Sequence, residues 1–229
     1  MFEYKQYISG DKPQNLLIFL HGYNGSIADH QYAIEWLQKY LRQTVLIMPE
    51  APEICDKNPA KKQWFGMLKY DAENARAKPE TPIEKIFEIY NAAAAEVSTN
   101  AGRLNNFISA MQKQFGFSDS QTYLAGFSQG AMLTIYTALT RNAPLAGGFV
   151  LSGLVAGEKL LAQSIKSRPP LYLFHGKDDL KVQYKTLETT QKWLQKHGVM
   201  VQTQTYADLA HRMNEAEMQK VAQIINNRA

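Results

Sequence analysis

The chain has 229 residues, of which 45% are hydrophobic, and a formal net charge of +4. This length suits one sizeable α/β domain with an extensive core, so a single domain over residues 1–229 is expected. The basic residues are scattered and no apolar run approaches the ~20 residues that cross a bilayer, which argues against nucleic-acid binding and against stable membrane insertion.

The start of the chain and its cysteine content bear on the cellular compartment. Residues 1–6 lack the charged-then-apolar pattern of a signal peptide. The single cysteine, Cys55, cannot form an internal disulfide, which fits a reducing cytosol. A cytoplasmic location is therefore expected. Cys55 is a poor candidate nucleophile because no sharp turn surrounds it.

Strands and helices alternate from the first residues onward. Residues 3–7 favour an edge strand and residues 16–20 a central strand. Apolar residues at helical spacing predict a helix within 27–41, and the β-branched run at 44–48 predicts the next strand.

Residues 49–82 form a long segment with prolines, lysines and few strand signals. Trp64 and Phe65 lie inside it, so its composition is not that of a disordered region. A long ordered loop in a compact domain is often a lid or a binding loop. The alternative is a hydrophobic patch that covers one sheet edge, and the residues alone do not separate the two.

The rest of the chain continues the alternation. The expected elements are a helical region over 83–115, a strand at 122–125, a helix at 131–139, strands at 147–153, 172–176 and 199–206, and a closing amphipathic helix at 213–225. This order implies a mostly parallel central sheet with helices on both faces, a three-layer α/β fold.

The sequence Gly126-Phe127-Ser128-Gln129-Gly130 lies between a predicted strand and a predicted helix. A Gly-x-Ser-x-Gly in this context is the signature of a nucleophile elbow. The turn forces the serine into a strained backbone conformation, and the glycines let strand and helix approach closely. Ser128 is therefore the candidate nucleophile.

A serine nucleophile needs a base and an orienting carboxylate, which follow it in the order acid, then histidine, in hydrolases built on this elbow. His211 lies in the loop after the last predicted strand and is the candidate base. Asp178 and Asp179 follow the 172–176 strand, and spacing separates them only weakly. Asp208 also lies near His211, where an exposed turn residue is the alternative interpretation.

Four other histidines compete with His211. His197 precedes a glycine at a predicted helix end, and His30 is expected to be solvated at a helix start. His21 and His175 precede glycines at strand ends, where such residues more often brace a loop than transfer protons.

The chain resembles the phospholipase/carboxylesterase family of α/β-hydrolases, which includes acyl-protein thioesterases. The matching pieces span nearly the whole chain: Leu20-His21-Gly22, Pro49-Glu50-Ala51-Pro52, Trp64-Phe65, Gly126 to Gly130, Leu151-Ser152-Gly153, His175 to Asp179 and Ala210-His211. By this resemblance Ser128 is the nucleophile, His211 the base and Asp179 the acid. The backbone N–H groups of Tyr23 and Gln129 would form the oxyanion hole.

The resemblance also implies the reaction. It indicates a serine carboxylesterase that cleaves ester or thioester bonds of a lysophospholipid, an acylated protein or a small acyl ester, with Trp64 and Phe65 near the acyl group. No cofactor or metal is expected, and homodimers are common among relatives. A lactonase, peptidase or lipase on the same fold, or a non-catalytic binding protein, are the alternatives.

The sequence departs from the family pattern at several positions. Asn24-Gly25 replaces a glycine and an acidic residue, and Ala210 replaces the glycine before the base. Gln183 replaces a proline after the catalytic acid, and Ala131 replaces a glycine after the elbow. These changes leave the three catalytic candidates intact and bear on the shape of the oxyanion loop and acyl pocket.

Overall fold

A seven-stranded sheet, in the order β1-β3-β2-β6-β7-β8-β9, forms the centre of the protein. The computed structural model describes residues 2–227. All neighbouring strands are parallel except β1, which pairs antiparallel with β3. The strands are β1 (Tyr4–Ser9), β2 (Asn15–Leu20), β3 (Thr44–Pro49), β6 (Thr122–Phe127), β7 (Gly147–Leu151), β8 (Leu171–Gly176) and β9 (Val201–Tyr206).

The five central strands are buried along their whole length, whereas the edge strands β1 and β9 are partly exposed. Continuous burial explains why the central strands are apolar on both sides rather than alternating, because helices cover both faces of a parallel sheet. The β-branched and aromatic side chains in these runs suit that environment.

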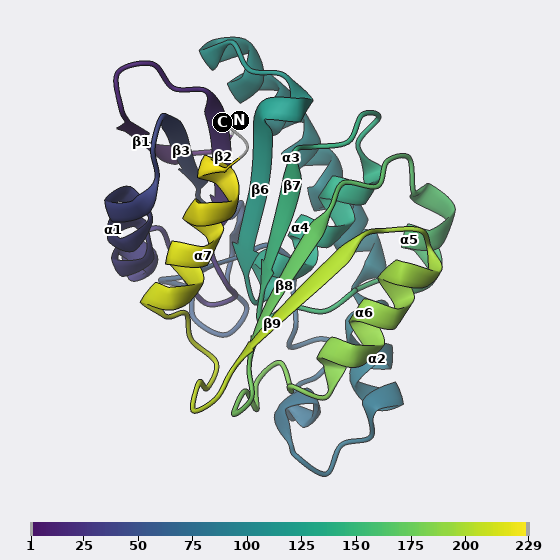
Figure 1. Ribbon diagram of the computed structural model, residues 1–229. Coiled ribbons are helices and arrows are strands. Elements are labelled where there is room, and N and C mark those ends of the chain that lie inside the picture. The colour runs from purple at the N-terminus through teal and green to yellow at the C-terminus, as the bar shows by residue number, and fades with distance from the viewer. Residues whose placement is uncertain (1, 228–229) are drawn as a thin grey trace.

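Helices cover the sheet on both sides (Figure 1). Helices α1 (Gln31–Tyr40) and α7 (Glu215–Asn226) pack together on one face, where Ile34, Leu37 and Val221 join the apolar core. The other face carries α2 (Ile83–Ala92), α3 (Ala94–Phe115), α4 (Gln129–Thr140), α5 (Glu158–Ser164) and α6 (Thr186–Lys196). The predicted three-layer fold with a mostly parallel sheet is confirmed.

The region predicted as helical over residues 83–115 is two helices that meet at Ala93. The run of alanines there gives no sequence signal for a break. Long-range contacts fix the direction of α2 instead, because Asn91 Oδ1 accepts hydrogen bonds from the backbone N–H groups of Gly157 and Glu158 at the start of α5 (2.9 and 3.1 Å). Helix α5 itself was not predicted from the sequence.

Residues 49–82 contain more regular secondary structure than their sequence indicates. They contain the short antiparallel strands β4 (Glu53–Ile54) and β5 (Lys62–Gln63) and a 3₁₀ turn, η2 (Ala75–Ala77). Two further 3₁₀ turns, η1 (Ala28–His30) and η3 (Asp119–Gln121), precede α1 and β6. Within residues 2–227, no helix is long and apolar enough to cross a membrane.

Candidate active site

Ser128 lies at the sharp turn between β6 and α4 and has a strained backbone, with φ 55° and ψ −117°. Its N–H donates to the carbonyl of Leu151 at 2.9 Å, which holds the turn against β7. A Cβ at Gly126 would collide with the backbone of Gly130. The two glycines therefore permit the close strand–helix approach that projects the serine at the carboxyl end of the sheet.

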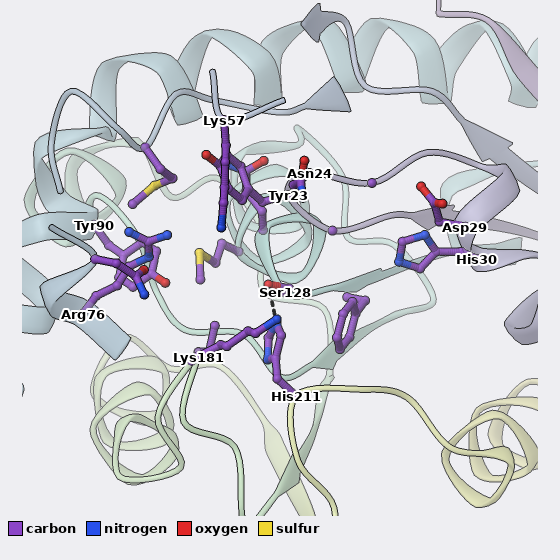
Figure 2. A pocket seen from close by; sticks show the side chains of 18 residues that line it. Tyr23, Asn24, Asp29, His30, Lys57, Arg76, Tyr90, Ser128, Lys181 and His211 are labelled. Atoms are coloured by element: carbon purple, nitrogen blue, oxygen red, sulfur yellow. Dashed lines mark hydrogen bonds between the residues drawn. The ribbon is translucent and has the colours of Figure 1, made fainter. Parts of the chain in front are cut away.

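His211 connects Ser128 to Asp179. The imidazole Nε2 lies 2.9 Å from Ser128 Oγ, and Nδ1 lies 2.7 Å from Asp179 Oδ2. Figure 2 shows the imidazole pointing at the serine. The ring of Phe127 packs against the imidazole with a centroid separation of 4.8 Å, which restricts its orientation. The structure thus brings together three side chains that lie far apart in the sequence.

Asp179 is buried and ionised. Burial alone would raise the pKa of its carboxyl group, but hydrogen bonds and charge interactions with His175 and His211 hold that pKa far below its usual value. Its second oxygen, Oδ1, accepts from the backbone N–H groups of Lys181 (2.9 Å) and Val182 (3.0 Å). Oδ2 therefore faces His211 in a fixed position.

Asp178 and Asp208, the other carboxylate candidates, lie outside this arrangement. Both side chains are exposed. Asp208 has a left-handed backbone with φ 54°, typical of a turn. His175 is buried beneath Asp179, with Nε2 donating to the carbonyl of Val182 at 2.8 Å, and so braces the loop as the sequence indicated.

The loop after β2 lies directly against the elbow. A Cβ at Gly22 would lie 3.4 Å from the Cβ of Ser128 and 3.2 Å from the ring of Phe127. Tyr23 and Gln129 both line the cavity that contains Ser128, and the structure gives their backbone N–H groups no hydrogen-bond partner among the described residues. Gln129 is the first residue of α4, where helical N–H groups are free by geometry.

The sequence model of the phospholipase/carboxylesterase family matches residues 7–228. The chain belongs to this family. Its members are hydrolases, so the expectation of an enzyme of the carboxylesterase and thioesterase type is confirmed.

Individual proteins of known name align with nearly the whole chain. Acyl-protein thioesterase 1 of Kluyveromyces lactis is 25% identical over 224 residues, which is 93% of this chain and 91% of that protein. Carboxylesterase SOBER1 of Arabidopsis thaliana is 22% identical over 222 residues, 94% of this chain and 91% of that protein. Among solved structures, esterase PE8 superimposes with a TM-score of 0.83 at 24% identity, covering 99% of this chain and 98% of that chain. The structural likeness shows the fold.

Trp64 and Phe65, which the family resemblance places near the acyl group, belong to the apolar core. Both side chains are fully buried and neither lines the cavity of this hydrolase. Their backbone is held by Gln129, whose Oε1 accepts from the N–H of Trp64 (2.7 Å) and whose Nε2 donates to the carbonyl of Phe65 (2.6 Å). Contact between either side chain and an acyl group stays a prediction, while the Trp64 and Phe65 backbone holds the Gln129 side chain in place.

The two histidines near the loop after β2, His21 and His30, are buried. His21 accepts from the N–H of Ala51 at 3.0 Å and thereby ties the loop after β2 to the loop after β3. His30, predicted to be solvated, is only 7% exposed and lies beside His21 and Phe127. Burial lowers the pKa of His30. The prediction was wrong because tertiary packing of η1 against the elbow is not visible in the local sequence.

A cavity of about 320 Å³ opens beside Ser128. Besides the predicted residues, its walls include side chains that the sequence did not single out: Asp29, Lys57, Met67, Asn74, Arg76, Tyr90, Met132, Lys181 and Val182. Of these residues, Lys181 is the one that the sequence could have indicated, because it follows Asp179 by two positions. Among residues 2–227 there is no group of three metal-ligating side chains that could hold an ion.

Proposed function

We propose that the protein is a serine carboxylesterase in which Ser128 is the nucleophile, His211 the general base and Asp179 the orienting carboxylate. One observation carries the proposal: Ser128 Oγ, the His211 ring and the Asp179 carboxylate form a continuous hydrogen-bonded chain of 2.9 and 2.7 Å. These lengths lie within the range needed for proton transfer from a hydroxyl to a base.

In the proposed reaction, Nε2 of His211 removes the proton of Ser128 as Oγ attacks the carbonyl carbon of the substrate. Asp179 accepts from Nδ1–H, so it fixes the tautomer that leaves Nε2 free and stabilises the imidazolium that forms. His211 then gives the proton to the departing alcohol or thiol. Water repeats the sequence on the acyl-enzyme and releases the acid.

The negative charge of the tetrahedral intermediate is proposed to rest on the N–H groups of Tyr23 and Gln129. Two features support this. Both residues line the cavity, their N–H groups have no other partner among the described residues, and both belong to segments held by side-chain hydrogen bonds. The Tyr23 side chain is anchored by a hydrogen bond to Asp56, and Gln129 by its bonds to Trp64 and Phe65. Loss of one such donor typically costs about 2.7–4 kcal/mol.

The bond that is cleaved is proposed to be the ester or thioester of a lysophospholipid, of an acylated protein or of a small acyl ester. The names of the relatives suggest these substrates. We propose that the protein is a single domain that acts in the cytoplasm. A homodimer is proposed because the family resemblance implies one. Residues 49–82 are proposed to act as a wall of the acyl site, because they contribute Lys57, Met67 and Arg76 to the cavity.

The experiment that tests the proposal is replacement of Ser128 by alanine. Hydrolysis of p-nitrophenyl acetate should fall by at least about a thousandfold, since deletion of a triad serine elsewhere costs on the order of a millionfold. A fluorophosphonate should label the parent protein and not the variant. Ser109→Ala is the matched control, because Ser109 is an exposed serine of α3 whose hydroxyl bonds its own helix. Retained activity in a folded Ser128→Ala protein would refute the assignment.

A further inference from the structure

The cavity beside Ser128 carries an excess of positive charge. Lys57, Arg76 and Lys181 all line it. Asp29 is the one carboxylate among the described lining residues, and it is already paired with Lys61 at 2.6 Å. A cavity in which one charge sign predominates attracts ligands of the opposite sign, and it does so more strongly where water is partly excluded.

Arg76 is held rigidly in the wall. Its Nη1 donates to Asp71 Oδ2 at 2.6 Å, and the side chains of Arg76 and Asp71 are only 14% and 3% exposed. The Asp71 carboxylate also accepts from the backbone N–H groups of Ala75 (2.6 Å) and Arg76 (3.2 Å), so its negative charge is shared between the guanidinium and the loop backbone. The guanidinium is therefore fixed before any ligand arrives.

Gln183 fastens this loop to the loop of the proposed catalytic acid. The side chain is buried, and its Nε2 donates to the carbonyls of Arg76 and Lys78 at 2.8 Å each. The family resemblance leads us to expect a proline at this position, and its side chain could make neither bond. Gln183, which departs from the family pattern, is thus the residue whose side chain holds the backbone of Arg76 in place.

Tyr90 supplies a neutral donor beside Arg76. The residue is buried, yet it lines the cavity, and Figure 2 shows it next to the guanidinium. Burial raises the pKa of Tyr90 to about 12, although the neighbouring Arg76 acts in the opposite direction. The hydroxyl therefore keeps its proton at neutral pH and can donate it to an anionic oxygen.

Lys181 and Lys57 complete the cluster. Both are exposed at the cavity mouth, and neither Nζ forms an ion pair or a hydrogen bond with another described residue. In Figure 2 the side chain of Lys181 extends from the Arg76 side of the cavity toward Ser128 and His211. Its backbone N–H is bonded to Asp179, so its position is coupled to that of the catalytic group.

We propose that the substrate of this esterase carries a carboxylate, which Arg76, Tyr90 and the two lysines bind while its ester carbonyl lies at Ser128. This inference rests on the proposed function and narrows its substrate class. A planar guanidinium matches a carboxylate in two parallel hydrogen bonds, and charge-assisted bonds of this kind are about twice as strong as neutral ones. Met67 and Met132 provide the apolar surface for the carbon atoms of the substrate.

The shape of the site disfavours a long neutral chain. Its volume of about 320 Å³ lies at the lower end of the range for small-molecule sites, roughly 300–1,000 Å³. An alkyl group placed against Arg76 and Lys181 would remove water from charged groups without replacing its hydrogen bonds, which is costly. The carboxylate could sit on the acyl group or on the alcohol, since the same cations would bind it in either case.

Two matched pairs of esters test the inference. The p-nitrophenyl monoester of glutaric acid is compared with p-nitrophenyl pentanoate, and 4-acetoxybenzoate with its methyl ester. Each kcat/KM is divided by the rate constant of hydroxide hydrolysis for the same ester, so that intrinsic reactivity cancels. The parent enzyme should prefer the anionic member of at least one pair by about tenfold or more, the size expected for one charged hydrogen bond.

Three variants identify the groups responsible. Lys181→Gln should lower the anionic-to-neutral ratio about threefold or more, because an exposed charge contributes less than a buried one. The double variant Arg76→Gln/Asp71→Asn should lower it by about tenfold, and it leaves no unpaired charge in the loop. Lys177→Gln is the control, because Lys177 is exposed on the same loop as Lys181 but does not line the cavity. Its ratio should equal that of the parent.

The outcomes separate this inference from the proposed function. Equal or faster hydrolysis of the neutral ester in both pairs by the parent overturns the inference alone, provided that Ser128 is labelled by a fluorophosphonate. An anionic preference that survives in both cavity variants also overturns it. If Ser128 is neither labelled nor active on any ester, the proposed function fails as well.

Discussion

Asp178 and Asp179 are neighbours in the sequence, yet their surroundings differ completely. Asp179 is 1% exposed and bonded to His211, whereas Asp178 is exposed. The local sequence cannot separate them, because the difference arises from the loop that turns Asp179 inward through bonds to the N–H groups of Lys181 and Val182. Spacing favoured Asp179 only weakly, and the family resemblance settled the choice.

Replacement of each aspartate by asparagine tests these roles. Asp179→Asn should lower kcat on p-nitrophenyl acetate by about 10⁴-fold, because an amide in place of the carboxylate favours the wrong tautomer of the base. Asp178→Asn changes the charge of the same loop equally and should keep kcat within about twofold of the parent, as an exposed group does. Comparable losses in both variants would contradict the proposed arrangement.

At the scale of elements, the predictions succeeded where a pattern is local. The central strands were recognised from continuous apolar runs, and the elbow from its glycines. The failures involve contacts between distant segments. His30 was expected in solvent and is buried beside His21 and Phe127. The burial of Trp64 and Phe65 was not predicted either; their backbone is bonded to the Gln129 side chain, and the Trp64 carbonyl also accepts from Asn100. An aromatic pair in a loop gives no indication of which side it will face.

The elbow also yields a test of how closely its helix approaches the sheet. A Cβ at Gly130 would lie 2.5 and 2.6 Å from the carbonyl oxygens of Leu20 and His21, and neither backbone group can move freely. Gly130→Ala should therefore push α4 away from β2, lower the free energy of unfolding by about 1–3 kcal/mol and displace Ser128 from the loop after β2. Chemical denaturation and esterase assays measure the two effects.

Gly102 provides the matched control for this substitution. It lies within α3, and a Cβ there would meet no atom within 4 Å. Gly102→Ala should raise the free energy of unfolding by about 0.5–1 kcal/mol, because alanine loses less backbone entropy in a helix. A Gly130→Ala protein as stable and active as the parent would show that the elbow tolerates more separation than these distances allow.

At the scale of the whole molecule, one buried carboxyl group couples folding to pH. Glu217 caps the start of α7, where its Oε2 accepts from the N–H of Asn214 at 2.9 Å. Its Oε1 is buried and has no hydrogen-bond partner within residues 2–227. Burial raises the pKa of Glu217 from the usual 4.5 to about 7, and the nearby charge of Asp179 acts in the same direction. Ionisation of Glu217 therefore opposes folding.

The sign of the effect follows from proton binding. Between pH 4.5 and about 7 the folded protein keeps a proton on Glu217 that the unfolded chain has lost, so the stabilising contribution of this proton declines as pH rises. Glu217→Gln removes the titration while keeping an oxygen for Asn214. At pH 8.5 the variant should exceed the parent in free energy of unfolding by about 3 kcal/mol, from the size of the pKa change.

The measurement compares the free energy of unfolding of the parent with that of Glu217→Gln at each pH, because the difference between the two is more informative than either pH curve alone. Histidines and other carboxylates titrate in both proteins and cancel in this difference, which isolates Glu217. Urea denaturation at a series of pH values should give a difference that is near its minimum at pH 4.5 and grows until about pH 7. A constant difference over this interval would mean that Glu217 ionises in the fold as it does in water. Burial at the start of α7 would then exert no electrostatic cost on the molecule.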